Sequence, residues 1–230
     1  MRLSIIVPIL NEGELAVESV KRLASFRAAG HELIVVDGGS ENLPTDTLKP
    51  HVDHLLTSPP GRATQMNLGA SVATGDVFWF LHVDSLVDPS VDRTVLDVVS
   101  NGAGWGRFDI RLSGSQPLLR LVERMMNWRS CRSGIATGDQ GVFIHRSLFK
   151  QVEGYPEQAL MEDIEISRRL KKHMPPVCLR EELLTSSRRW EQQGILRTIL
   201  LMWGLRLAYW LGVSPARLAG FYRPCTTAPS

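Results

Sequence analysis

A short apolar run that ends in charged residues limits what this 230-residue chain can fold into. Residues 77–83 read Val-Phe-Trp-Phe-Leu-His-Val and are followed at once by Asp84. A run of this length, rich in aromatic and β-branched residues, is typical of a strand buried on both faces of a parallel sheet. Ligands bind at the carboxyl ends of such strands, so Asp84 is either placed to act on a ligand or caps the next turn.

Two earlier segments repeat this pattern of an apolar strand followed by a polar loop. Residues 3–10 lead into an acidic turn at residues 11–14, and residues 32–36 lead into Asp-Gly-Gly-Ser at residues 37–40. Helical spacing of apolar residues separates the two segments. Two successive strand–helix units whose loops share one edge predict a right-handed parallel sheet.

Composition and missing motifs exclude several kinds of protein. The net charge of +2 is too small to indicate nucleic acid as a partner. The dinucleotide fingerprint, the P-loop and the GxSxG elbow are absent, which argues against nicotinamide dehydrogenases, P-loop ATPases and α/β-hydrolases. Cys131, Cys178 and Cys225 lie far apart, so the spacing predicts no zinc motif and no disulfide framework. A reducing, cytoplasmic setting is therefore expected.

Further polar residues accompany predicted helices and strands downstream. Arg62 opens a helix over residues 61–70, where it either meets a phosphate or stays solvated. Residues 102–115 are glycine-rich and predict a strand flanked by loops over the site. Residues 118–128 carry apolar side chains at helical spacing, which favours a core helix. Asp139, in a Gly-Asp-Gln-Gly loop before the strand at residues 142–144, is a candidate contact for a sugar or acceptor.

Two adjacent carboxylates, Glu162 and Asp163, start a helix predicted over residues 161–170. Acidic residues at a helix start complement the macrodipole, which is the purely structural interpretation. A carboxylate in this position can also serve as a general base if a substrate hydroxyl reaches it.

In order and spacing, four motifs resemble the inverting family-2 glycosyltransferases with a GT-A fold. The motifs are residues 4–12, 35–40, 67–69 and 81–84. The resemblance extends from residue 3 to residue 190 and is closest to a compact bacterial subgroup of stand-alone enzymes. It implies an α/β catalytic domain over residues 1–193, with a mostly parallel central sheet flanked by helices, and a helical tail over residues 194–230.

The resemblance implies a hexosyltransferase that moves a sugar from a nucleoside-diphosphate sugar, with UDP favoured, to an acceptor hydroxyl. It assigns Asp37 to the nucleotide base, Asp84 to a Mg²⁺ or Mn²⁺ ion, and Asp163 to the general base. His82 stands where the metal motif has its first acid. This histidine either binds the metal or only packs and hydrogen-bonds nearby, and we favour the second.

The same resemblance points to further site positions. On the nucleotide-sugar side these are Pro8, Asn11, Glu12, Gly39, Arg62, Asn67 and Asp139. At the catalytic end they are Glu162, Arg189 and Trp190. Arg189 and Trp190 match the end of the family's QxxRW motif, although Ser186 replaces its glutamine, and the polar loop around them is expected to order when the donor binds.

The tail is apolar and basic. Its uncharged run between Arg197 and Arg206 is far shorter than the roughly 20 residues that span a bilayer. A helix with this composition lies at a membrane surface, packs on the catalytic domain, or packs on a second subunit. Residues after Arg223 are expected to fray.

Two other functions compete with glycosyl transfer. A nucleotidyltransferase would share the sheet and the metal carboxylate, but its glycine-rich, basic N-terminal loop is missing, since the first loop here is acidic. A non-catalytic relative that only binds nucleotide sugars would keep Asp37 and Asp84 without needing Asp163.

Overall fold

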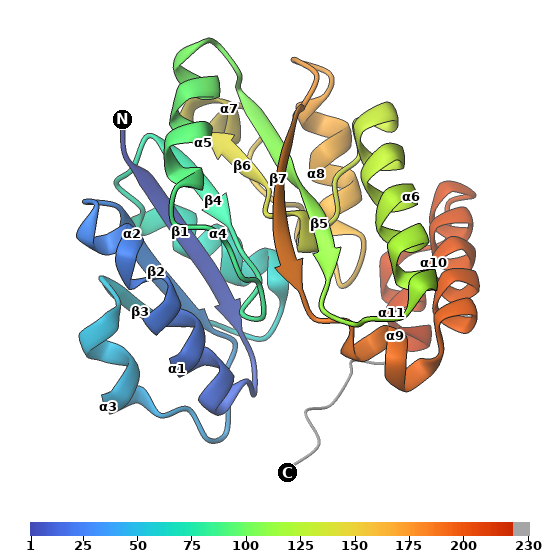
Figure 1. Ribbon diagram of the computed structural model, residues 1–230, viewed down its shortest axis with the longest axis horizontal. Coiled ribbons are helices and arrows are strands. Elements are labelled where there is room, and N and C mark those ends of the chain that lie inside the picture. The colour runs from blue at the N-terminus through green and yellow to red at the C-terminus, as the bar shows by residue number, and fades with distance from the viewer. Residues whose placement is uncertain (223–230) are drawn as a thin grey trace.

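The computed structural model of the chain describes residues 1–222 and is built on one mixed sheet (Figure 1). Its seven strands lie in the order β3-β2-β1-β4-β6-β5-β7. The strands are β1 (Leu3–Ile9), β2 (Glu32–Asp37), β3 (His54–Thr57), β4 (Val77–Phe80), β5 (Trp105–Leu112), β6 (Phe143–His145) and β7 (Val177–Thr185).

The first four strands are parallel, as the repeated strand–helix pattern predicts. β4 stops at Phe80, where its pairing with Ile6 ends, although Leu81 still donates a hydrogen bond to the Ile6 carbonyl. The apolar run therefore outlasts the strand. His82 and Asp84 lie in the turn beyond it, at the carboxyl edge of the sheet.

Side chains that alternate along β1 separate two hydrophobic cores. Ile5 and Val7 pack with α1, α2 and α5, whereas Ile6 packs with α4, α7 and α8 on the other face. Covering both faces explains why the strands are continuously apolar. The helices in these layers are α1 (Gly13–Arg22), α2 (Ala24–Ala28), α3 (Thr45–Leu48), α4 (Arg62–Val72), α5 (Val91–Ser100), α7 (Arg146–Gln151) and α8 (Glu162–Leu170).

The second half of the sheet is mixed. β6 runs antiparallel to both β4 and β5, and β5 pairs in parallel with the edge strand β7. The segment 102–115 contains the strand that its sequence predicts, and this strand, β5, lies inside the sheet between β6 and β7. The edge strand β7 pairs with β5 along nearly its whole length.

The helix α6 (Pro117–Ser133) corrects the expectation of a core helix. Leu119 and Val122 are buried, but Leu121 and Met125 are about half exposed. One side of α6 packs on β5 and on the tail, and the other side is exposed. The apolar residues of this segment therefore lie on two faces of the helix, of which one is buried.

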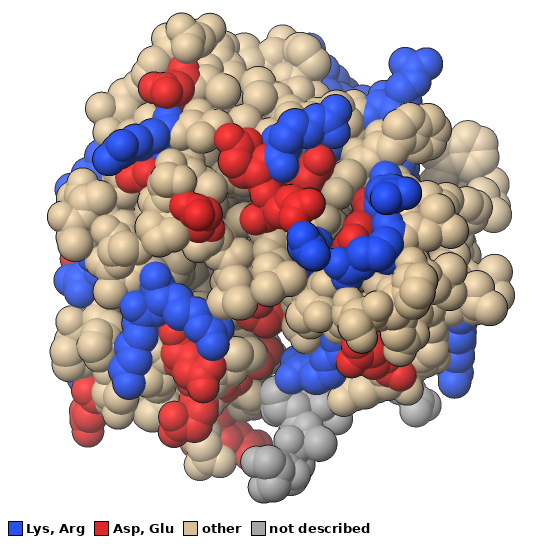
Figure 2. All heavy atoms as spheres, in the orientation of Figure 1, with Lys and Arg blue, Asp and Glu red and all other residues tan. Residues whose placement is uncertain are grey.

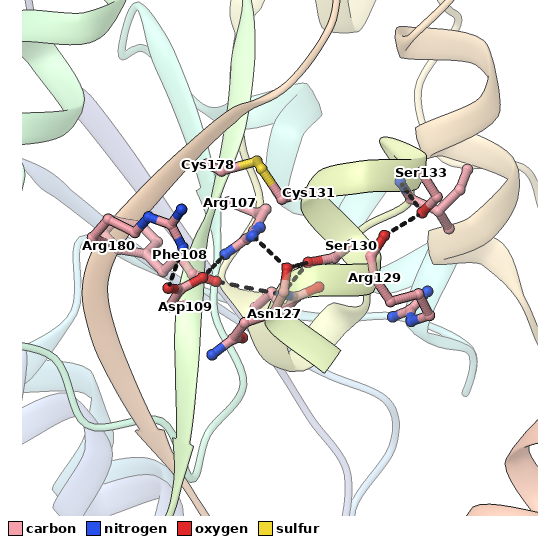
Figure 3. The surroundings of a disulfide bond; sticks show 12 residues. Arg107, Phe108, Asp109, Asn127, Arg129, Ser130, Cys131, Ser133, Cys178 and Arg180 are labelled. Atoms are coloured by element: carbon pink, nitrogen blue, oxygen red, sulfur yellow. Dashed lines mark hydrogen bonds and ion pairs between the residues drawn. A yellow bond between two sulfur atoms is a disulfide. The ribbon is translucent and has the colours of Figure 1, made fainter. Parts of the chain in front are cut away.

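Cys131 and Cys178 form a disulfide, which contradicts the expectation that the cysteines stay unpaired (Figure 3). The bond joins the last turn of α6 to β7 across a sequence separation of 47 residues. Sequence spacing missed it because only the packing of α6 against the sheet edge brings the two residues together. The cysteine pattern thus no longer supports a reducing compartment. Cys225 lies outside the described residues, as does the segment expected to fray.

The tail packs on its own chain through α9 (Arg188–Gln193), α10 (Ile195–Trp210) and α11 (Pro215–Phe221). Residues 188–193 form a helical turn and not the loop we expected. Leu205 and Leu218 are buried with Met161, next to the start of α8. Within residues 1–222, no helix is long and apolar enough to cross a membrane.

Candidate active site

The loops after β1 and β2 form one hydrogen-bonded network. The Asp37 carboxylate accepts bonds from the backbone N–H groups of Gly39 and Ser40, at 3.2 and 3.0 Å. The Ser40 hydroxyl in turn accepts a bond from the Asn11 N–H at 2.7 Å. Asp37 is only 5% exposed, and its carboxylate stabilises the turn that follows β2. Asn11, Asp37 and Gly39 lie together, as predicted, at the edge where β1 and β2 end.

Asp84 and Glu12 form an acidic pair beside Arg188. Burial raises the pKa of Asp84, and the nearby charges of Arg188 and Arg62 oppose that rise. Burial also raises the pKa of Glu12, where Arg188 again opposes it and Asp84 adds to it. Asp84 and Arg188 line one shallow hollow with Ser186.

This pair suits a hard cation only in part. Oε2 of Glu12 is buried and has no hydrogen-bond partner among residues 1–222, which leaves this oxygen available beside Asp84. Mg²⁺ and Mn²⁺ prefer oxygen ligands, and Mg²⁺ commonly takes one or two carboxylates together with phosphate oxygens and water. No group of three or more His, Cys, Asp or Glu side chains in residues 1–222 is arranged to hold a metal. Asp84 and Glu12 therefore fit a cation that a diphosphate helps to bind.

His82 is committed to Arg62. Its Nε2 lies against the Nη2 of Arg62, and burial followed by the Arg62 charge holds the pKa of His82 well below its usual value. Neutral His82 thus accepts a hydrogen bond with the nitrogen that would otherwise bind metal. Gly138 makes this possible, because a Cβ there would approach the His82 Nε2 to 2.7 Å and the Arg62 Nη2 to 2.8 Å.

Arg62 also faces the start of α8. Its Nε lies 3.8 Å from the Glu162 carboxylate, and burial together with neighbouring Asp163 raises the pKa of Glu162 while Arg62 lowers it. Asp163 accepts a hydrogen bond from the Gly138 N–H at 3.2 Å and one from the Ile164 N–H at 2.7 Å. Backbone donors therefore orient the Asp163 carboxylate.

A second hollow collects several predicted residues. Its lining includes Pro8, Arg62, Glu162 and Asp163. Tyr155 lines it too, and burial, then the charge of Asp163, raises the pKa of its hydroxyl. The tertiary structure thus brings a strand residue, a helix start and the α8 carboxylates together from positions up to 155 residues apart in the chain.

Asp139 lies next to Asp163 without lining this hollow. Its carboxylate accepts a hydrogen bond from the Thr137 hydroxyl. Burial raises its pKa; the Thr137 hydrogen bond opposes that rise, and the charge of Asp163 adds to it. Arg129 and Arg206 are the cations that act on Asp139.

Three of the predicted site residues make contacts within the protein itself. The side-chain amide of Asn67 donates a hydrogen bond to the Tyr155 carbonyl at 2.8 Å and accepts one from the Tyr155 N–H at 2.9 Å. Arg189 lies over the ring of Tyr222, 4.2 Å from its centroid. Trp190 packs against the small core between β5, α6 and α10.

The sequence analysis did not assign four residues to the site, three arginines and one tyrosine, namely Arg129, Arg188, Arg206 and Tyr155. Only Arg188 carried a signal, since it adjoins the predicted Arg189. It is Arg188, and not Arg189, that acts on Asp84. Neighbouring residues on a helix point in different directions, so the packing of α9 decides which of the two arginines lies near Asp84.

Comparisons with known proteins identify the family and the fold of the chain. The model of the family "Glycosyl transferase family 2" matches residues 4–125. The uncharacterized glycosyltransferase YibD of Escherichia coli strain K12 is 28% identical over 118 residues, a segment covering 45% of this chain and 34% of YibD. The chain therefore spans about a third of that relative's length.

Solved glycosyltransferases share the fold at low sequence identity. Staphylococcus aureus TarS 1–349 with UDP-GlcNAc has a TM-score of 0.63 at 15% identity, over 81% of this chain and 58% of its own. Mannosyltransferase PcManGT from Pyrobaculum calidifontis, with GDP-Man and Mn²⁺, has a TM-score of 0.61 at 18% identity, over 80% and 56%. The seven-stranded sheet and its helices thus have the GT-A architecture. Since the family model covers more than half of its residues, this chain belongs to glycosyl transferase family 2.

Proposed function

We propose that this chain transfers a hexosyl group from a nucleoside-diphosphate sugar to an acceptor hydroxyl, with inversion at the anomeric carbon. The observation that carries the proposal is the position of Arg62 between two carboxylate pairs. Its charge acts on Asp84 at the end of β4 and on Glu162 at the start of α8. A donor bound along this edge meets a metal-binding carboxylate at one end and a basic carboxylate at the other.

Asp163 is the general base in this proposal. Its Oδ2 is oriented by the Gly138 N–H, and it takes the proton of the acceptor hydroxyl as that oxygen attacks the anomeric carbon. The bond from that carbon to the diphosphate oxygen breaks on the opposite face, which inverts the configuration. No covalent enzyme intermediate is required.

The leaving diphosphate gains negative charge as the bond breaks. Arg188, beside Asp84 and Glu12, is placed to pair with it. Asp84 and Glu12 would hold Mg²⁺ or Mn²⁺, which when bound neutralises phosphate charge as a Lewis acid. UDP is the favoured nucleotide, since TarS was solved with UDP-GlcNAc, although PcManGT was solved with GDP-Man.

In this proposal residues 1–193 are the catalytic domain, and the tail from residue 194 covers its acceptor side. Tyr222 reaches the site from the end of α11, where it lies against Arg189. Asp37 and Gly39 form the edge that receives the nucleotide base. Asp139 is the candidate contact for the acceptor.

Calorimetric titration tests the donor site first. UDP, GDP, CDP and dTDP are titrated with and without Mn²⁺ into the wild type and into Asp84→Ala. We expect one nucleotide to bind in a metal-dependent way and to lose that binding in Asp84→Ala. Absence of binding by all four nucleotides contradicts the proposal.

Asp163→Asn tests the base. Turnover of the donor that binds is expected to fall about 10³-fold, because general base catalysis contributes on this scale, while nucleotide affinity is unchanged. The matched control is Glu165→Gln, on the same helix, whose carboxylate pairs with Arg169. Unchanged turnover in Asp163→Asn removes Asp163 from the mechanism. Release of pyrophosphate in place of a nucleoside diphosphate would identify a nucleotidyltransferase.

A further inference from the structure

Two arginines near Asp163 have side chains without a hydrogen-bond or ion-pair partner in the part of the chain that the structure describes. Five arginines hold a buried guanidinium nitrogen that makes no hydrogen bond, namely Arg107, Arg120, Arg129, Arg146 and Arg206. Three of the five use other nitrogens of the same group, with Asp109, Glu123 and the Ala73 carbonyl as partners. The side chains of Arg129 and Arg206 form no hydrogen bond or ion pair within residues 1–222.

These two guanidinium groups lie close enough for their charges to act on each other and on Asp139. Arg129 comes from α6, where its side chain points away from the disulfide (Figure 3), and Arg206 comes from α10. Burial, followed by the charge of Arg206, lowers the pKa of Arg129 to about 10, and Asp139 and Asp163 oppose that fall. Two cations and two carboxylates from four segments therefore meet here.

The nearby carboxylates do not satisfy these arginines. Asp163 accepts its hydrogen bonds from backbone N–H groups, and Asp139 accepts one from Thr137. A buried donor without a partner destabilises the fold, and the cost is greater when the donor is charged. Two such donors beside each other add mutual repulsion. An anion between them would remove both penalties, and the planar guanidinium fork suits phosphate or carboxylate oxygens.

We propose that Arg129 and Arg206 together bind an anionic group of the acceptor, a phosphate or a carboxylate, and so hold its hydroxyl at Asp163. This inference rests on the proposed function, because it assigns the acceptor of the same site. It predicts that neutral sugars are poor acceptors and that acidic ones are good acceptors.

The test titrates inorganic phosphate and, separately, acetate into the full chain saturated with the nucleotide that it binds. Saturation keeps the probe from the diphosphate position. We expect one probe to bind the wild type and to bind Arg129→Gln and Arg206→Gln at least tenfold more weakly. The control is Arg197→Gln, an exposed arginine on the same helix as Arg206, and its affinity is expected to be unchanged.

Nucleotide affinity separates the possible failures. If the variants bind nucleotide normally but bind the probe like the wild type, or if neither probe binds the wild type, the anion site is wrong and the donor site stands. If no nucleotide binds, the proposed function fails, and the probe is then titrated alone. Arg206→Lys keeps the charge without the fork and is expected to restore part of the affinity, which a misfolded Arg206→Gln protein could not explain.

A second, independent observation concerns the outer face of α6 and α10. Exposed apolar side chains recur along α10 at positions 196, 200, 203, 207 and 210, with exposures of 58–73%. Leu118, Leu121, Met125 and Trp128 are exposed on α6, which packs beside α10 through buried residues of both helices. We call these nine side chains the apolar face. Figure 2 shows largely uncharged surface on this side of the molecule.

Charge decides what this face binds. Apart from the pair Arg120–Glu123 and the two arginines of the anion site, the helices α6, α10 and α11 carry four arginines, at positions 124, 132, 197 and 217, and no acidic residue. Two copies of an apolar face on helices that carry only unpaired positive charge within residues 1–222 would repel each other, whereas an anionic bilayer attracts basic residues near its surface. Tryptophans at positions 128, 203 and 210 suit the headgroup region. We infer that the apolar face lies on an anionic membrane surface.

Vesicle sedimentation tests this surface with the full chain. We expect binding to vesicles of phosphatidylcholine mixed equally with phosphatidylglycerol, at least tenfold weaker binding to pure phosphatidylcholine, and at least tenfold weaker binding of Trp203→Glu. The control is Leu10→Glu, an exposed leucine 42% accessible at the end of β1. Equal binding by Trp203→Glu contradicts the proposal. So does a dimer in solution that Trp203→Glu dissociates, since the face would then bind a second copy.

Discussion

Glu32 and Asp139 are both buried carboxylates, but they lie in different halves of the molecule and are bonded differently. Glu32, in the parallel half formed by β1–β4, accepts hydrogen bonds from the Ser4 hydroxyl and from the N–H and hydroxyl of Thr74. Asp139, in the mixed half formed by β5–β7 with α6 and α8–α11, accepts one from Thr137. Glu32 is thus satisfied internally, whereas Asp139 keeps charge available to a ligand.

The arginines show the same contrast. In the parallel half, Arg27 donates two hydrogen bonds to Asp53, at 3.1 and 2.9 Å. In the mixed half, Arg129 and Arg206 have no such partner among the described residues. Unsatisfied buried groups cost stability and persist where function uses them. The difference indicates that unsatisfied charge on Arg129 and Arg206 marks a place where a ligand binds, as does the Oε2 of Glu12 on the donor side, which lacks a partner in residues 1–222.

Loss of the disulfide is expected to have the largest effect, and it acts on the mixed half alone. Cys131→Ser opens a closed loop of 47 residues that contains α8 and Asp163. The chain-entropy estimate for that loop is about 4 kcal/mol, or a fall in Tm of roughly 10 °C. Thermal unfolding with and without reductant measures it. Cys225→Ser is the control, and an unchanged Tm in Cys131→Ser would show that the bond does not stabilise this half.

Arg188→Gln tests whether the two halves meet at the diphosphate. The variant removes the arginine whose charge acts on both Asp84 and Glu12. Nucleoside-diphosphate affinity is expected to fall about 10–100-fold, which corresponds to a charged hydrogen bond of roughly 1.5–3 kcal/mol. Calorimetry of the variant against Arg180→Gln, an arginine 78% exposed, measures it. Equal affinities would place the diphosphate elsewhere.

Glu32→Gln tests the internally bonded carboxylate. Burial alone would raise the pKa of Glu32, but the hydrogen bonds from Ser4 and Thr74 outweigh burial and lower it. Glu32 therefore contributes stability that is fully present above about pH 4.5 and is lost as the pH falls through its lower folded pKa. We expect the variant to lose about 2 kcal/mol at pH 7.

Denaturant unfolding of the wild type and Glu32→Gln between pH 3 and pH 7 measures this contribution. The two curves are expected to converge as the pH falls, because protonated Glu32 resembles glutamine. Parallel curves would mean that the loss comes from packing and not from charge.

Asp139→Asn should have the smallest effect, with the opposite sign. Burial holds the pKa of Asp139 above its usual value, so the folded chain binds this proton more tightly, and its stability falls as the pH rises from about 3.8 through the raised pKa. Removing the charge is expected to stabilise the chain by about 1 kcal/mol at pH 7 and to reduce turnover. Tm and turnover measured on one preparation check both effects. A lower Tm would place Asp139 among the internally satisfied groups.

Most of the parallel half was predictable from the sequence. Strands β1, β2 and β4 are buried on both faces and lead into polar loops, so their apolar runs predicted that they exist, although the run at residues 77–83 did not show that β4 ends at Phe80. The positions of Asp37 and Asp84 at the sheet edge followed from the rule that parallel strands end together. Local patterns decide this half because neighbouring segments of the chain pack on one another.

The mixed half was predicted less well. The pairing of Cys131 with Cys178, the two faces of α6 and the packing of the tail on α8 all depend on contacts between distant segments. Spacing along one helix cannot tell which of two apolar faces another element covers. The choice between a tail on its own core and a tail elsewhere was open for the same reason.

By itself, the sequence determined the kind of sheet, the edge at which its carboxylates lie and the family. Only the tertiary structure decided that Arg188 faces Asp84, that Arg62 engages His82, and that Arg129 and Arg206 converge near Asp163. Strands and turns depend on residues that are close together in the chain, so a sequence shows them directly. The direction of a side chain on a helix, and the charges that it meets, depend on how helices far apart in the chain pack, and that is a property of the folded core.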